Sequence, residues 1–262
     1  MLPDQRYQRI RALLASFQHV TNERIADDLK VSRETVRRDV SVLESWGELR
    51  RVYGGVKRTA PEPEPPLQQR VKTQRPEKRA IARAAAKLLR PGDAVFIDSG
   101  STTSLLAEEL ASLRGLTVVT NSFDVALKLS VPDTQGQQRH HVHLLGGTPV
   151  AQAGASVAAS YGASTVAEIM RWRMDWAMLS PVGVSADQGA SDYEPFEAEV
   201  ARAMVTQAQH TVILADHSKI GQRSRTSFCP VDGIYQLISD KRARGLPALA
   251  ALKEAGCKVV LA

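Results

Sequence analysis

The sequence has little of what marks several large classes of protein. Its 262 residues hold two cysteines, Cys229 and Cys257, and no CxxC pair, which excludes a disulfide framework and a cysteine-based zinc site. No apolar run approaches the ~20 residues of a membrane-spanning helix. The N-terminus MLPDQRYQRIRALL lacks the apolar stretch of a signal peptide. We therefore expect a cytoplasmic protein that does not enter the membrane.

Motifs for nucleotide cofactors are also missing. There is no GxxxxGK[ST] loop, and no GxGxxG follows the first long apolar strand. These absences argue against nucleotide triphosphate hydrolysis and against a nicotinamide cofactor. Histidines cluster at His140, His141 and His143, and the last two share one strand face. Without a nearby third ligand they are better explained as the polar start of a strand, so we expect neither a cofactor nor a metal.

Positive charge is concentrated in the first fifth of the chain. Residues 1–58 contain 12 Lys and Arg against 8 Asp and Glu, whereas the remaining 204 residues contain 22 against 20. A local excess of this sign favours a polyanionic partner for the N-terminal part.

Three helical segments can be predicted in this part. The first covers residues 4–16 and carries an apolar stripe at Ile10, Leu13, Leu14 and Phe17. A short second helix follows an N-cap at Thr21, and a third begins after a turn of two or three residues, capped by Ser32. Two helices joined this tightly are typical of a helix-turn-helix unit, whose second helix enters the DNA major groove.

The third helix, SRETVRRDV, carries the charge. Val36, Val40 and Leu43 have the spacing of an inward face, which leaves the arginines and Glu34 outside. An exposed helix held by a Glu34–Arg38 pair is the alternative, but the tight turn and the charge excess favour DNA. LRRV and residues 56–58 then predict a basic hairpin, or wing, turning at Gly54-Gly55. The residues expected to contact DNA are Ser32, Arg33, Glu34, Thr35, Arg37, Arg38, Arg50, Arg51, Tyr53 and Lys57.

The run from Arg9 to Gly55, above all VSRETVRRDV…L…W…LRRVYGG, resembles the winged helix-turn-helix of the DeoR family of bacterial transcriptional regulators. The family commonly has histidine before the glycine pair, where this chain has Tyr53. Tyrosine still donates one hydrogen bond to a phosphate, so DNA binding remains the expectation.

A proline-rich segment separates this part from the rest. TAPEPEPPLQQ, residues 59–69, contains four prolines and predicts a semi-rigid spacer. Order is expected to resume at Glu77 with an amphipathic helix. The predicted domains are therefore a winged helix-turn-helix (1–58), a linker (59–76) and an effector-binding domain (77–262).

The second domain alternates apolar strands with helical patterns. This alternation predicts an α/β fold with a largely parallel sheet, whose ligands bind at the carboxyl ends of the strands. The predicted strands are 94–98, 116–120, 142–145, 176–180, 211–215, 235–239 and 258–262. The predicted helices are 103–113, 123–129, 156–172, 196–209 and 246–255.

The end of the first of these strands, FIDSGSTTS, has the residue types of a phosphate cradle. A glycine and three hydroxyls open a helix, whose N-terminal N–H groups attract anions. The hydroxyls could also do no more than cap that helix. Later strand ends add groups suited to a phosphorylated, polyhydroxylated ligand: Asn121, Asp192 and Glu197 for hydroxyls, and Lys219 for phosphate.

Further blocks, among them EKRAIARAAAKLLRPGDAVFIDSGSTTSLLAEEL, LTVVTNS, LLGG, EAEVARAMV and VILADHSKIG, resemble the C-terminal sensor domain of the DeoR family. The resemblance implies a fold like that of ribose-5-phosphate isomerase and a phosphorylated sugar or polyol effector. Ser101 replaces the usual threonine, and Ser180-Pro181-Val182 replaces a glycine-containing segment. By position, the effector would be bound by Asp98, Gly100, Ser101, Thr102, Thr103, Asn121, Gly147, Glu197 and Lys219, and we add Asp192.

These features together predict a repressor of a carbohydrate or polyol catabolism operon. It would bind operator DNA as a homo-oligomer, a dimer or a tetramer, under control of the effector. The rival hypothesis is a sugar-phosphate isomerase with an accessory DNA-binding module, in which Glu197 would be the general base.

Overall fold

The computed structural model describes residues 3–17, 19–45, 49–58, 67–151 and 157–262. Contacts within the chain divide it into two compact units, Met1–Pro63 and Glu64–Ala262. Trp46 and Gly47, which precede the predicted wing, and residues 59–66 of the predicted spacer lie outside the described residues.

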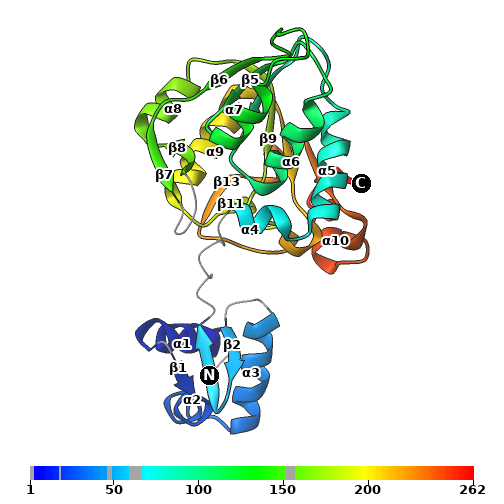
Figure 1. Ribbon diagram of the computed structural model, residues 1–262. Helices are drawn as coiled ribbons and strands as arrows, with labels where there is room; N and C mark the ends of the chain where they lie inside the picture. The colour runs from blue at the N-terminus through cyan, green and yellow to red at the C-terminus, as the bar shows by residue number, and fades with distance from the viewer. Residues whose placement is uncertain (1–2, 18, 46–48, 59–66, 152–156) are drawn as a thin grey trace. The chain divides into compact units, whose positions relative to one another are not determined.

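The N-terminal unit packs three helices against a small antiparallel sheet (Figure 1). Thr21 Oγ1 caps the second helix by accepting from Arg24 N at 3.2 Å, and Ser32 Oγ accepts from Thr35 N at 3.2 Å. Both caps were predicted, and the helix-turn-helix is confirmed. The elements are α1 (Pro3–Ser16), β1 (His19–Thr21), α2 (Asn22–Leu29), α3 (Arg33–Ser45), β2 (Leu49–Val52) and β3 (Gly55–Arg58), with strand order β1-β3-β2.

The wing is the β2–β3 hairpin. Val52 pairs with Gly55, so the turn consists of Tyr53 and Gly54, one residue earlier than predicted. Gly54 has φ +79°, which favours glycine. Gly55 is needed for another reason, because a Cβ there would lie 2.3 Å from the carbonyl oxygen of Val20 in β1, a strand that the sequence did not reveal.

The C-terminal unit is built on a seven-stranded parallel sheet of order β15-β14-β12-β9-β4-β5-β6. Each of its strands overlaps one of the seven predicted apolar runs, so the α/β fold class is confirmed. The strands are β4 (Ala94–Ile97), β5 (Thr117–Thr120), β6 (His141–Leu144), β9 (Met174–Leu179), β12 (Ala208–Leu214), β14 (Gln236–Ser239) and β15 (Val259–Leu261).

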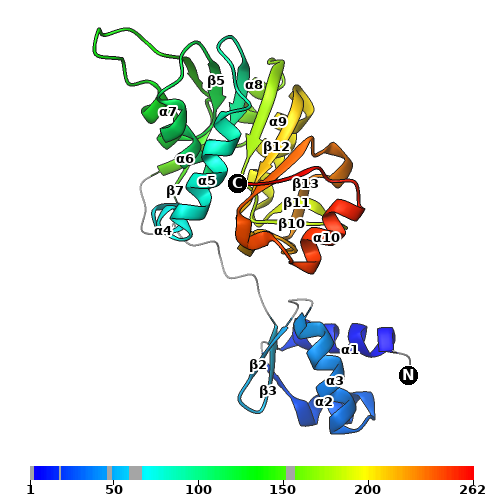
Figure 2. The same cartoon turned by 90° about the vertical axis from the view of Figure 1, so that its right-hand side faces the viewer.

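Helices cover both faces of this sheet, as the labels in Figures 1 and 2 show. Side chains alternate between the two faces: Val95 and Ile97 of β4 belong to one apolar core, and Phe96 to the other. On the first side lie α4 (Leu67–Lys72), α5 (Arg75–Ala86), α6 (Ser101–Leu110) and α7 (Phe123–Leu129), and on the second α8 (Ala163–Ile169), α9 (Pro195–Gln207) and α10 (Pro247–Glu254).

One predicted helix of this unit is wrong in part. The helix predicted over 156–172 is shorter, because residues 157–161 pair as a strand and α8 starts only after Gly162, at φ +106°. The antiparallel strands were not predicted; they are β7 (Thr148–Ala151), β8 (Val157–Tyr161), β10 (Gly183–Ser185), β11 (Gly189–Asp192) and β13 (Thr226–Cys229).

The predicted linker also ends earlier than residue 76. Pro66 is the last proline of the rich segment, and α4 begins at Leu67. Val71 packs against the core beneath α5 and α6, and the buried Lys78 Nζ donates to the carbonyl oxygen of Arg70 at 2.6 Å. Residues from Leu67 onward are therefore part of the C-terminal unit.

Candidate functional site: a DNA-binding face and an effector pocket

Helix α3, the predicted recognition helix, is held against the rest of the unit by an apolar face and an ion pair. Val36, Val40 and Leu43 are buried, as predicted. Asp39 is buried too, and Arg6 of α1 donates to its two oxygens at 2.6 and 2.9 Å. Such a bidentate pair is geometrically specific, so it fixes the rotation of α3 against α1.

The outer face of α3 presents three arginines. The side chains of Arg33, Arg37 and Arg38 are 76, 69 and 80% exposed. Arg33 contacts Glu23 at 2.6 Å, while Arg37 and Arg38 share Glu34 at 3.1 and 3.5 Å. Exposed pairs of this kind contribute about 0–1 kcal/mol, so a DNA phosphate can replace the carboxylate at small cost.

The wing extends this basic surface. Arg50 and Lys57 are paired across the hairpin and exposed, and Tyr53 at the tip is fully exposed. Arg51, which is also predicted to contact DNA, is exposed and has partners within the unit. It contacts Glu44 at 3.1 Å and donates to the carbonyl oxygen of Arg37 at 3.2 Å, so it braces the wing against α3.

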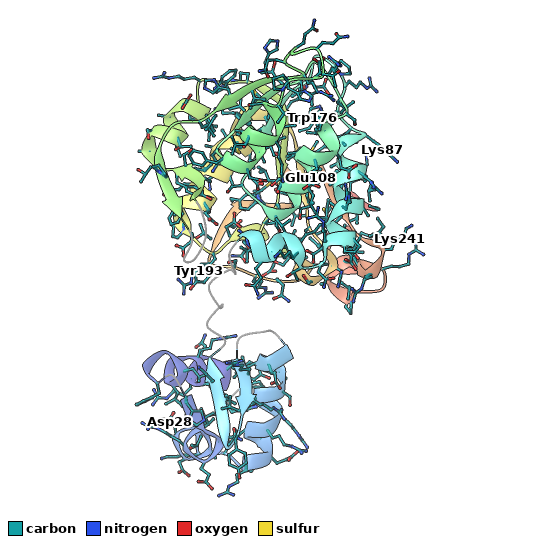
Figure 3. All side chains as sticks on the ribbon, viewed as in Figure 1. Asp28, Lys87, Glu108, Trp176, Tyr193 and Lys241 are labelled. Atoms are coloured by element: carbon teal, nitrogen blue, oxygen red, sulfur yellow. The ribbon has the colours of Figure 1, made fainter. Side chains whose placement is uncertain are left out.

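Asp28 of α2, labelled in Figure 3, makes a similar bracing contact. Its two oxygens accept from Arg9 of α1 at 2.6 and 3.0 Å. This hydrogen bond, with the charge of Arg9, lowers the pKa of Asp28. The ion pair joins α2 to α1. The exposed arginines of the helix-turn-helix described above lie on the outer face of α3.

In the C-terminal unit, Asp98 organises the turn between β4 and α6. Its Oδ1 accepts from Gly100 N at 3.0 Å and from Thr103 Oγ1 at 2.7 Å, and its Oδ2 accepts from Ser180 N at 2.6 Å. Burial raises the pKa of Asp98, and these bonds together with the charge of Lys219 oppose that rise. The carboxylate therefore joins the end of β4 to the end of β9.

Gly100 is required at this turn by close packing. A Cβ there would lie 2.4 Å from Ser180 Cβ and 3.1 Å from Asp98 Oδ1. The glycine lets the two strand ends approach, and α6 begins at the next residue. The N–H groups of the first turn of a helix have no intrahelical acceptor, so they are available to an anion.

A cavity opens beside this turn, with an empty volume of about 390 Å³ that includes open solvent. Its lining combines carboxylates, an amide, hydroxyls and one guanidinium. The lining residues are Arg70, Asp98, Ser99, Gly100, Asn121, Tyr161, Ser180, Asp192, Glu197, Val200 and Ala201.

Four buried polar atoms belong to the lining of the cavity or to the adjoining first turn of α6. Asn121 Oδ1 and Ser180 Oγ belong to lining residues, and Ser101 Oγ and Thr102 Oγ1 lie in the first turn of α6. None of the four atoms has a hydrogen-bond partner in the part of the chain that the structure describes. A buried polar atom without a partner costs about 1–3 kcal/mol, so such a group is a sign of a ligand site.

Tyr161 holds one wall of the cavity. Its hydroxyl donates to Glu197 Oε1 at 3.1 Å and lies 2.8 Å from Ser99 Oγ. Burial, together with the negative charge of Glu197, raises the pKa of Tyr161 well above its usual value. The phenol therefore stays protonated at neutral pH and positions the Glu197 carboxylate.

The structure brings half of the predicted effector residues into the cavity wall. Asp98, Gly100, Asn121, Asp192 and Glu197 line it directly.

The other predicted residues surround the cavity or lie elsewhere. Ser101 and Thr102 are buried at the adjoining N-terminus of α6. The hydroxyl of Thr103 forms hydrogen bonds with Asp98 Oδ1 and with the carbonyl oxygen of Gly100. Lys219 Nζ donates to the Pro181 carbonyl at 2.5 Å, close enough for its charge to act on Asp98.

Gly147 is not among the lining residues. With φ +147° and a would-be Cβ 2.1 Å from Thr165 Oγ1, it permits the close packing of α8, and its contact with an effector stays a prediction.

Sequence reasoning missed six lining residues for identifiable reasons. Arg70 lay in the predicted linker, and Tyr161 lay in a segment predicted to be helical. Ser180 was noted only as a departure from the family pattern. Ser99 stood within the FIDSGSTTS motif, while Val200 and Ala201 had no polar chemistry to reveal them.

Within the described residues, the histidines belong to no group of three or more His, Cys, Asp or Glu side chains that is placed to hold a metal ion. His143 Nε2 contacts Glu168 Oε1 at 2.6 Å, and the buried His140 contacts the carbonyl oxygen of Leu110 at 3.1 Å. Nor does any helix within the described ranges combine the length and apolarity needed to cross a bilayer.

Comparisons with known proteins cover most of the chain. Residues 6–62 match the DeoR-like helix-turn-helix domain, and residues 73–241 match the DeoR C terminal sensor domain. The HTH-type transcriptional repressor GlcR of Bacillus subtilis is 32% identical over 92% of this chain and 90% of its own. The glycerol-3-phosphate regulon repressor of Escherichia coli is 29% identical over 90% and 91%.

Among solved structures, ribose 5-phosphate isomerase A of Methanocaldococcus jannaschii aligns with a TM-score of 0.36 and 17% identity. The alignment covers 54% of this chain and 52% of that one.

Proposed function

Because this chain belongs to the DeoR family of bacterial transcriptional regulators, we propose that it represses a carbohydrate or polyol catabolism operon under control of a phosphorylated sugar or polyol. It is a regulator rather than an enzyme, since its curated relatives are named as repressors. We place it in the bacterial cytoplasm, where its DNA target lies.

Operator recognition is assigned to the outer face of α3 and to the wing. This surface carries Arg33, Arg37 and Arg38 on α3, the second helix of the helix-turn-helix. It also carries Arg50 and Lys57 on the hairpin. Arginine binds guanine edges or phosphates bidentately, so the same face serves both sequence reading and backbone contact.

The effector is assigned to the cavity beside α6. The observation that carries this proposal is a pair of buried polar atoms of lining residues, Asn121 Oδ1 and Ser180 Oγ, that have no hydrogen-bond partner among the described residues. Ser101 Oγ and Thr102 Oγ1, in the adjoining first turn of α6, likewise have none. The N-terminal N–H groups of α6 suit a phosphoryl group, and the Asp192 and Glu197 carboxylates suit hydroxyl donors. A phosphorylated, polyhydroxylated compound offers both.

Control requires that the effector bind two states of the protein with different affinities. We propose a homo-oligomer, a dimer or a tetramer, whose helix-turn-helix units match operator half-sites about one helical turn apart. Effector binding would alter that match, and operator affinity would change with it.

A thermal-shift panel of sugar and polyol phosphates, each with its unphosphorylated parent, tests the effector assignment. A compound at 100 times its dissociation constant stabilises the folded state by about 2.7 kcal/mol, which is readily measured. We expect at least one phosphorylated compound to raise the melting temperature and its parent to fail. If only unphosphorylated compounds stabilise the protein, the phosphate assignment is wrong.

A further inference from the structure

Arg70 is the cavity residue with the least expected origin. It comes from α4, the helix that follows directly on the segment joining the two units, and it lines the same cavity as Gly100 and Glu197. α4 also packs against α6, whose N-terminus borders that cavity. An arginine is thus placed beside the helix end to which we assign the phosphoryl group.

The position of α4 is held by a buried lysine. Lys78 of α5 is 3% exposed, and its Nζ donates to the carbonyl oxygen of Arg70 at 2.6 Å. The same Nζ lies 4.0 Å from Asp216 Oδ2 in the loop after β12. The backbone that carries Arg70 is therefore fixed to two other elements of the unit, and this keeps Arg70 in the lining of the cavity.

The negative charge of the cavity lining requires a positive group near any phosphate that binds there. Three carboxylates, those of Asp98, Asp192 and Glu197, belong to its lining. An entering phosphate would be repelled by them unless a positive group stood close to it. Among the described residues that line the cavity, Arg70 carries the one guanidinium, and guanidinium binds phosphate bidentately.

We propose that Arg70 binds the phosphoryl group of the effector together with the N-terminus of α6, and that α4 is thereby part of the effector site. This inference rests on the proposed function and adds to it a residue that selects for the anion. It also joins ligand binding to α4, the first helix of the C-terminal unit among the described residues. A ligand that contacts α4 would supply the differential contact that control requires if the position of α4 differs between the two states of the protein.

The experiment compares full-length wild type with Arg70→Gln, Arg70→Lys and a matched control, Arg244→Gln. Arg244 is exposed and belongs to the same unit, but it does not line the cavity. Dissociation constants are measured by calorimetry for glycerol 3-phosphate, glucose 6-phosphate and inorganic phosphate, and for glycerol and glucose. Melting curves of each variant report whether it is folded.

We expect Arg70→Gln to weaken binding of the phosphorylated compound by roughly 10- to 100-fold relative to wild type. This is the range for the loss of a charge-assisted contact. Arg70→Lys should fall between it and wild type, and Arg244→Gln should match wild type. Any weak binding of the unphosphorylated parent that calorimetry detects in wild type should change by less than twofold in every variant.

Two results overturn the inference while leaving the proposed function standing. One is tight binding of the phosphorylated compound by Arg70→Gln. The other is an equal loss for the phosphorylated compound and its parent, which would make Arg70 a structural residue. If wild type binds no phosphorylated compound in this panel or the wider one, the proposed function fails, and the inference fails with it.

Discussion

Replacement of Gly100 by alanine tests how closely the two strand ends must approach. Gly100 has φ −78° and ψ 161°, which any residue adopts, so the substitution adds no backbone strain. The new methyl group would lie 2.4 Å from Ser180 Cβ, against an ordinary carbon–carbon contact of about 3.5–4.0 Å. Ser180 must move, and the 2.6 Å bond from its N–H to Asp98 must lengthen.

Overpacking of this kind costs about 1–3 kcal/mol. In a unit of this size each kcal/mol lowers the melting temperature by about 2–4 °C, so we expect a fall of roughly 2–12 °C. Effector affinity should fall as well, because Asp98, Gly100 and Ser180 all line the cavity.

Scanning fluorimetry with and without ligand measures both effects. Gly146→Ala is the matched control, since it has no left-handed φ and its Cβ would meet Glu168 Oε2 at an ordinary 3.5 Å. A Gly100→Ala protein that melts with wild type and binds effector normally would refute the reasoning.

Three other changes have defined outcomes. Asp39→Ala removes the carboxylate that binds two nitrogens of Arg6, so urea denaturation of the N-terminal unit should show a loss of about 1–3 kcal/mol, and an unchanged midpoint would contradict this role. Arg38→Ala should reduce the salt slope of operator binding by about one if the side chain meets phosphate, or relax sequence preference if it meets a base; no change in either would exclude α3 as the recognition helix. The pKa of Asp133 is lowered by the hydrogen bond from the N–H of Gln137 and then by Arg114. The contribution of this carboxylate to the stability of the folded state is therefore complete above the unfolded pKa of about 3.9 and is lost as the pH falls. Asp133→Asn should therefore melt below wild type at pH 7, with the gap closing in acid; an equal gap at pH 3 would argue otherwise.

The parallel sheet could be predicted because its strands are buried on both faces. The run AVFI is continuously apolar and TVVT consists of β-branched residues, and both features favour a buried strand. The short strands 157–161 and 189–192 lack it, being built of VAASY and GASD. Their identity depends on pairing partners elsewhere in the chain, which one sequence does not reveal.

The site could be predicted where a residue with a binding function directly follows the end of a strand. Asp98, Gly100 and Asn121 stand at such positions, and the sheet brings those ends together. Arg70 and Tyr161 reach the same cavity through tertiary packing of a short helix and an antiparallel strand. No local pattern marks them, and a run of prolines before α4 concealed the first.

The most direct test of the account measures binding of the full-length protein to a fluorescent duplex that carries its operator, by anisotropy, as a phosphorylated effector is added. The account predicts tight binding that weakens steeply with salt and an operator affinity that changes with the phosphorylated compound alone. No binding at low ionic strength, or an operator affinity indifferent to every phosphorylated sugar and polyol, would contradict it.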